Sequence, residues 1–216
     1  MKRRAAAKLL EIFERLFAQY GTPECPLVFN SIFQLLTAVT LSAQTTDKAV
    51  NAVTAVLFAK YGTAAEMAVA DEAAVGEIIR PIGLFRNKSK NLVAAAKMIC
   101  SDFAGEVPQT MAELVRLPGV GRKSANVILG VGFGIPGFPA DTHVQRLLVR
   151  LGVVDRRDPL LAERVVCENL APEYWTDFSH LLIRHGRAVC AAGRPQCGDC
   201  PLTELCEYYG GKSGCA

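Results

Sequence analysis

Apolar residues recur at the three- and four-residue spacing of helices along almost the whole chain. No segment alternates between apolar and polar residues in the way that predicts a strand. The pattern therefore predicts an all-α fold. The helices that it predicts cover residues 5–20, 31–44, 46–60, 71–79, 87–103, 110–117, 122–132, 142–151, 159–170 and 175–188.

Glycine and proline interrupt the helices and indicate how the chain is divided. The stretch GIPGFP at 134–139 is rich in both and predicts a crossing between two lobes. It lies in the longest uncharged segment, residues 124–140, whose glycines and prolines exclude a membrane span. The first helix contains Glu11, Glu14 and Arg15, which exclude the uncharged core of a signal peptide. We therefore expect no membrane segment and a cytoplasmic protein.

Charge is distributed unevenly along the chain. The 216 residues and 50% hydrophobic content suffice for one or two domains, and a net charge of +3 neither requires nor excludes a polyanionic partner. However, no acid occurs between residues 80 and 97, or between 114 and 140. These segments predict an electropositive surface. The cations of the first are Arg80, Arg86, Lys88, Lys90 and Lys97, and those of the second are Arg116, Arg122 and Lys123.

Four of the eight cysteines form a compact C-x6-C-x2-C-x5-C motif: Cys190, Cys197, Cys200 and Cys206. Without a secretory signal, this cluster favours a metal site over disulfides. Four thiolates suit structural zinc or a four-iron cluster. Zinc sites commonly use two C-x2-C pairs, whereas only Cys197 and Cys200 form such a pair here, which favours iron–sulfur. The other cysteines have apolar neighbours or lie in the tail. We interpret Cys25, Cys100 and Cys167 as core or incidental residues and place Cys215 in a frayed terminus.

The segment LPGVG at 117–121 predicts a tight turn between two helices. We expect Pro118 to end the first helix and Gly119 and Gly121 to adopt positive φ. Such a turn presents backbone N–H groups to a phosphate oxygen, and Arg122 adds positive charge. An ordinary helical corner with a solvated Arg122 and Lys123 explains the PGxG pattern alone equally well.

Lys123 and Asp141 are the candidate reactive pair. A lysine amine is a nucleophile only without its proton, and a helix N-terminus contributes only about 0.3–1 kcal/mol towards losing it. Lys123 should therefore line a cleft. Asp141 is the nearest downstream acid; it precedes a predicted helix, so it can serve as an N-cap and also face the amine.

Five segments together resemble endonuclease III, the bacterial bifunctional DNA glycosylase of the helix-hairpin-helix superfamily. They are LSAQTTD (41–47), IGLF (82–85), LPGVGRKSAN (117–126), ADTHVQR (140–146) and the cysteine motif (190–206). The resemblance implies a two-lobed fold with a DNA cleft between the lobes. It implies a six-helix barrel domain at 23–135, with the helix-hairpin-helix at about 110–132. A helical iron–sulfur cluster domain, with a [4Fe-4S] cluster on the four cysteines, would comprise 1–22 and 136–216.

The resemblance also implies an activity. The substrate would be double-stranded DNA with an oxidised pyrimidine or an abasic site, recognised in base excision repair with the damaged nucleotide flipped out. Lys123 would attack the sugar C1′ and form a Schiff base that permits β-elimination, the AP lyase step, while Asp141 assists. Gln44 and Leu84 match the residues that fill the vacated space and wedge the stack. From the pattern alone they read as a helix-end glutamine and a core leucine.

The remaining DNA contacts that the resemblance implies are in the turn and on the cysteine side of the chain: Pro118, Gly119, Val120, Gly121, Arg122, His143, Arg187 and Arg194. The chain departs from the family pattern at Ala140 and Phe85, which bears on substrate preference rather than on chemistry. We expect a monomer that works at the bacterial nucleoid.

Three other functions account for the sequence less well. The adenine glycosylase branch has a glutamate near Val39 and lacks Lys123, so it does not fit. A non-catalytic DNA-binding protein with a redox-sensing cluster fits the turn and the cysteines but leaves the pair Lys123 and Asp141 unexplained. An electron-transfer ferredoxin does not account for the long helical chain.

Overall fold

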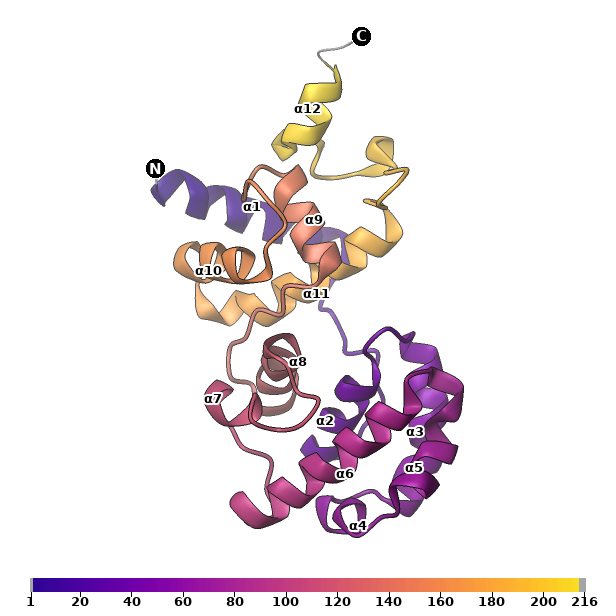
Figure 1. Cartoon of the computed structure of the whole chain (residues 1–216). Coiled ribbons are helices and arrows are strands. Elements are labelled where there is room, and N and C mark those ends of the chain that lie inside the picture. Colours follow the sequence, from indigo (N-terminus) through magenta and orange to yellow (C-terminus); the bar gives the residue numbers. More distant parts are fainter. Residues whose placement is uncertain (1, 214–216) are drawn as a thin grey trace. The chain divides into compact units, whose positions relative to one another are not determined.

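The computed structural model describes residues 2–213, which are helical with connecting turns and contain no strand (Figure 1). The prediction of an all-α chain is confirmed. The chain forms two compact units, one comprising Met1–Glu24 and Pro136–Ala216 and the other Cys25–Ile135. Cys215 lies outside the described residues. In the part of the chain that the structure describes, no helix is long and apolar enough to cross a membrane.

The unit formed by Cys25–Ile135 is a cluster of helices around one apolar core. Its central helix, α2, buries most of its residues, among them Leu35, Leu36 and Leu41. The helices are α2 (Ile32–Leu41), α3 (Asp47–Lys60), α4 (Ala64–Ala68), α5 (Glu72–Ile79), α6 (Phe85–Asp102), α7 (Met111–Leu114) and α8 (Arg122–Val127). A 3-10 turn, η1 (Arg80–Ile82), precedes α6, and a π-helical turn, η2 (Ile128–Gly132), continues α8.

The other unit has a second, separate core between its N-terminal helix and the C-terminal helices. Phe138 and Phe178 are fully buried in it, with their ring centroids 6.0 Å apart. Its helices are α1 (Lys2–Tyr20), α9 (Thr142–Arg150), α10 (Pro159–Asn169), α11 (Trp175–Ala188) and α12 (Glu207–Ser213), with 3-10 turns at Pro172–Tyr174, Cys197–Asp199 and Thr203–Leu205.

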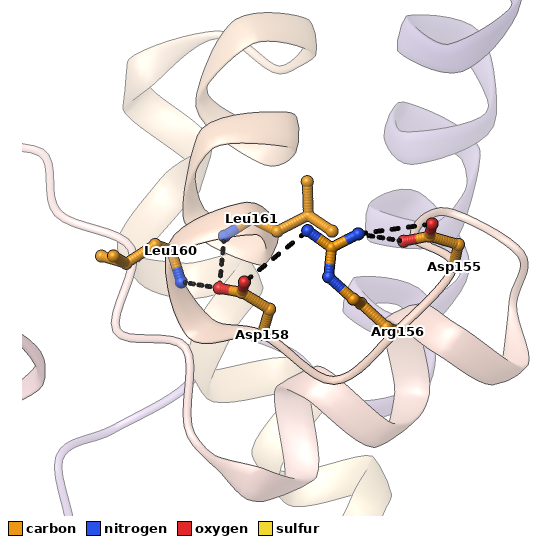
Figure 2. A network of polar contacts seen from close by, with 5 residues as sticks. All are labelled: Asp155, Arg156, Asp158, Leu160 and Leu161. Carbon is orange, nitrogen blue, oxygen red and sulfur yellow. Dashed lines mark hydrogen bonds and ion pairs between the residues drawn. The ribbon is translucent and has the colours of Figure 1, made fainter.

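Aspartate begins two helices of this unit. Asp158 caps α10 by accepting hydrogen bonds from the amides of Leu160 and Leu161 at 2.9 and 3.0 Å (Figure 2). Arg156 lies 3.9 Å from the second Asp158 oxygen and also contacts Asp155. The amides and Arg156 hold the pKa of Asp158 below its usual value. Asp158 is a half-buried helix cap with no role in the predicted chemistry, so it provides a reference for Asp141.

The sequence pattern failed to predict some short helices, and it wrongly placed the charge of Lys88 on the surface. Helices α4 and α12 were not predicted, and α7 ends at Leu114 rather than at residue 117. The expectation that Lys88 belongs to an electropositive surface is wrong, because its side chain is buried at 6% exposure.

Candidate active site and cysteine cluster

The LPGVG turn is fixed from inside by two apolar side chains. Leu117 and Val120 are buried in the core of the Cys25–Ile135 unit, and the Val120 amide donates to the Leu117 carbonyl at 3.0 Å. Pro118 is half-buried and Gly119 is exposed. Because the Val120 side chain and amide are both committed to the turn, any contact of Val120 with a ligand is limited to its carbonyl.

The two glycines of the turn have different roles. Gly119 has φ +82°, and a Cβ there would lie 3.1 Å from Thr40 and from Asn91. Gly121 has φ −91° and ψ 172°, which is extended backbone, and a Cβ there would meet nothing within 4 Å. The expectation of positive φ is confirmed for Gly119 and wrong for Gly121. Of these two positions, only Gly119 requires glycine for the fold.

This difference predicts opposite results for two matched substitutions. Gly119→Ala should lower the free energy of unfolding by about 1–3 kcal/mol, because alanine is strained at this φ and crowds Thr40 and Asn91. Gly121→Ala should change it by less than about 0.5 kcal/mol. Urea unfolding of both variants measures the difference. Equal losses would contradict the assignment of the strained position to Gly119.

Arg122 and Lys123 form the first turn of α8, immediately after Gly121, and both side chains are exposed. Gly121 offers no side-chain cap, so the first amides of α8 lack the partner that a serine or aspartate would supply. The turn therefore combines open backbone donors with two cations, which suits an anionic ligand.

Asp141 is the N-cap of α9, as predicted. One carboxylate oxygen, Oδ1, accepts from the amides of His143 and Val144 at 2.8 and 2.9 Å. The other oxygen, Oδ2, takes no part in the cap. Asp141 is half-buried, and the adjacent Ala140 is buried in the core. A carboxylate held in this way keeps a fixed orientation while one oxygen stays available.

Gln44 and Leu84 lie in two short loops of the Cys25–Ile135 unit and share an uncommon backbone. Gln44 has φ +55° and Leu84 has φ +50°, although neither is glycine. Both side chains are exposed, and Leu84 is 58% exposed. The alternative that Leu84 is a core leucine is therefore wrong. Strained backbone that displays an exposed apolar side chain is characteristic of a functional position.

The four cysteines of the motif line one small cavity of about 20 Å³. Within residues 2–213, no group of three or more His, Cys, Asp or Glu side chains is placed so as to hold a metal ion. Nevertheless, the walls of the cavity suit a group bound by thiolates. All four cysteines are half-buried, and two side-chain nitrogens that can carry a proton lie within hydrogen-bonding distance of their sulfurs.

The first of these donors is Arg150, whose Nη1 lies 3.1 Å from Cys190 Sγ. The second is His185, whose Nε2 lies 3.3 Å from Cys200 Sγ while its Nδ1 lies 2.8 Å from the Tyr20 hydroxyl. Burial lowers the pKa of His185 to about 4, so the ring is neutral at neutral pH. A neutral ring that accepts from Tyr20 at Nδ1 can donate from Nε2 to a Cys200 thiolate.

Sequence reasoning missed the two arginines that hold the cysteine loop. Arg146 is buried and donates to the carbonyls of Gly186 and Cys190 at 2.9 and 3.0 Å. Arg150, one turn later on α9, donates to the carbonyls of Ala191 and Ala192 at 2.9 and 2.8 Å. The four-residue spacing in THVQRLLVR was the available signal. The same helix thus carries the Asp141 cap and the support of the cysteine loop.

The remaining predicted residues lie in the same unit as Asp141. His143 is half-buried with its Nδ1 3.1 Å from Arg146 Nη2, and Gly186 leaves room for this pair. Arg187 and Arg194 are exposed. The structure thus places these three residues on α9, α11 and the cysteine loop.

A family model, curated sequences and solved structures all relate the chain to DNA repair proteins. Residues 37–172 match the family model of the HhH-GPD superfamily base excision DNA repair proteins. Endonuclease III from Synechocystis sp. is 46% identical over 206 residues, which cover 95% of this chain and 93% of that protein. A non-covalent endonuclease III–DNA complex superimposes with a TM-score of 0.90 at 37% identity and 99% coverage of both chains. A trapped endonuclease III–DNA covalent intermediate gives 0.89 at 38%, again with 99% coverage of both.

Proposed function

The chain belongs to the endonuclease III family of the HhH-GPD superfamily, and from this premise we propose how its residues act. It is a base excision repair DNA glycosylase with AP lyase activity. We propose that its substrates are oxidised pyrimidines and abasic sites in double-stranded DNA. The observation that carries this proposal is the exposed amine of Lys123 on the first turn of α8, directly after a turn with open backbone donors.

Lys123 is the proposed nucleophile. In the free protein the Lys123 side chain is exposed, and its amine is hydrated. We propose that bound DNA forms the other wall of the expected cleft. Entry of the damaged nucleotide then removes water from the amine. The Lys123 Nζ then bonds to C1′ as the bond from C1′ to the base breaks, and the base leaves with its electron pair.

Asp141 is the proposed carboxylate partner. Its Oδ1 is held by two amides of α9, and its Oδ2 is available to take a proton or to face positive charge on the sugar. The C1′–O4′ bond of the sugar ring then breaks, O4′ takes a proton, and C1′ and Nζ form the Schiff base. Loss of a C2′ proton breaks the C3′–O bond and releases the 3′-phosphate. The Schiff base is then hydrolysed and Lys123 is regenerated.

The LPGVG turn is the proposed phosphate contact. Arg122 and the first amides of α8 favour a phosphate oxygen on the turn, and this contact is independent of sequence. Gly121 is where the ligand approaches, because the space around it is open. His143, Arg187 and Arg194 are proposed as further contacts with the DNA backbone.

Gly121→Asp should weaken binding to every duplex alike. A side chain there does not strain the turn, so the loss comes from the carboxylate that faces a phosphate. Fluorescence anisotropy with abasic-analogue and undamaged duplexes checks this, with Gly121→Ala as the control for added volume. Unchanged affinity in Gly121→Asp would remove the turn from the DNA contact.

We propose a [4Fe-4S] cluster on Cys190, Cys197, Cys200 and Cys206. When bound, such a cluster cross-links a loop that has little secondary structure of its own. Arg150 and His185 would stabilise thiolate charge by donating to Cys190 and Cys200. These contacts support an assignment that otherwise rests on the cysteine spacing and the family.

Protein purified without air should be brown and contain about four irons per chain. Cys197→Ser should lose the cluster and its DNA affinity through disorder of the loop, while Cys167→Ser, outside the motif, should keep both. Iron analysis and the visible spectrum measure the cluster directly. Stoichiometric zinc in place of iron would contradict the assignment.

The experiment that tests the proposed function uses duplexes with a single thymine glycol or abasic site. We expect base release from the first, strand cleavage at both, and a covalent adduct after borohydride reduction. We expect the protein to act as a monomer. Binding without base release or an adduct would leave the non-catalytic DNA-binding function instead.

A further inference from the structure

A buried lysine joins the two loops that carry Gln44 and Leu84. Lys88, on the first turn of α6, is 6% exposed. Its Nζ donates to the Leu41 carbonyl at 3.0 Å, to Thr45 Oγ1 at 2.9 Å and to the Ile82 carbonyl at 3.4 Å. An ammonium has three N–H donors, and each of them has an acceptor oxygen here.

The surroundings of Lys88 are unusual for a buried cation. The ion pairs recorded among the described residues include no carboxylate partner for it, and burial lowers the pKa of its ammonium. Burying a charge is unfavourable, and an apolar side chain of similar length would fill the same volume without that cost. What lysine adds at this position is its three hydrogen bonds.

These bonds connect two strained segments. The Gln44 loop (residues 42–46) joins α2 to α3, and the Leu84 loop (residues 80–84) leads into α6. Thr45 Oγ1 also lies 3.0 Å from the Ile82 carbonyl, so Thr45 bridges the loops beside Lys88. Positive φ at Gln44 and Leu84 persists only where the surroundings impose it. Lys88 and Thr45 make the hydrogen bonds that join these two segments.

We propose that Lys88 is a positioning residue that locks the Gln44 loop to the Leu84 loop, so that both side chains enter the DNA stack as one preformed unit. The roles of these two side chains rest on the proposed function. Without the lock, the loops relax to commoner backbone angles and must be ordered again at each encounter, which slows nucleotide flipping. Excision of a lesion that is stacked in a duplex therefore depends on this lock. Reaction with an abasic site in single-stranded DNA does not, because that site is already unstacked.

The test compares two variants with two matched controls in the full-length, cluster-containing enzyme. Lys88→Met keeps the volume and removes the donors, and Thr45→Val removes the bridging hydroxyl. Thr45→Ser retains that hydroxyl. Lys97→Met removes an exposed lysine nine residues further along α6. All four are measured by loop hydrogen exchange, by kcat/KM on a thymine glycol duplex, and by borohydride trapping on single-stranded abasic DNA.

We expect faster exchange in both loops for Lys88→Met and Thr45→Val and wild-type exchange for the controls. For Lys88→Met, kcat/KM on the duplex should fall about 10- to 100-fold while trapping on the single strand stays within about twofold of wild type. Thr45→Ser and Lys97→Met should match wild type in both assays.

Three results would overturn the proposal: unchanged loop exchange in Lys88→Met, unchanged duplex activity, or an equal loss on both substrates in a folded variant. If Lys88→Met does not fold, Thr45→Val decides on the same criteria. An inactive wild-type enzyme would refute the proposed function, whereas the exchange comparison would still test the lock.

Discussion

Lys123→Gln should abolish base release and the covalent adduct while leaving the affinity for damaged duplex nearly unchanged. Glutamine is a polar side chain only slightly shorter than lysine, but it has no nucleophilic amine. The open amides of α8 and Arg122, which are proposed to bind phosphate, are still present. Base release, borohydride trapping and anisotropy on the same thymine glycol duplex measure the separation of chemistry from binding.

Lys97→Gln is the matched control, because Lys97 is also exposed and lies on α6. It should retain base release and the adduct. Wild-type trapping in Lys123→Gln would mean that another amine is the nucleophile. A loss of affinity as large as the loss of activity would mean that Lys123 mainly binds phosphate.

Asp141→Asn should slow base excision severely with little change in folding or DNA affinity. Asparagine retains a side-chain oxygen that can accept from the amides of His143 and Val144, so α9 keeps its N-cap. What is lost is the negative charge that accepts a proton and faces the sugar cation, a contribution of about 10²–10⁴ in rate for general acid–base catalysis. Single-turnover base release measures this loss.

Asp158→Asn is the control for capping alone, since Asp158 accepts from the second and third amides of α10 as Asp141 does in α9, and both residues are half-buried. It should keep wild-type activity. Asp141→Ala and Asp158→Ala should each lower the free energy of unfolding by about 0.5–2 kcal/mol through loss of a cap. If Asp158→Asn slowed base excision as much as Asp141→Asn, helix stability rather than charge would explain both.

The sequence predicted well those features that depend on local chemistry. The cap at Asp141 followed from an acid placed before an amphipathic helix, and positive φ at Gly119 followed from the glycine-rich turn LPGVG. Helix α4 was missed because only five residues form it, yet its signal was present: Thr63 and Glu66 make a reciprocal capping box. Helix α12 was missed because two glycines weaken its pattern.

Features that depend on tertiary packing could not be predicted in this way. Lys88 lies in a run of cations, a pattern that predicts an exposed charge. The surrounding loops instead bury it and accept three hydrogen bonds from its ammonium group. Gly121 resembles Gly119 in sequence, and only the path of the chain shows that its backbone is extended. The support of the cysteine loop by Arg146 and Arg150 likewise depends on the position of a loop more than 40 residues further along the chain.

The identity of the residue bonded to DNA tests the central claim most directly. Wild-type protein is reduced with borohydride on an abasic duplex, the adduct is digested with nuclease and protease, and the modified peptide is sequenced by mass spectrometry. The account predicts a sugar remnant on the Nζ of Lys123. A remnant on any other amine, with Lys123 unmodified, would contradict it.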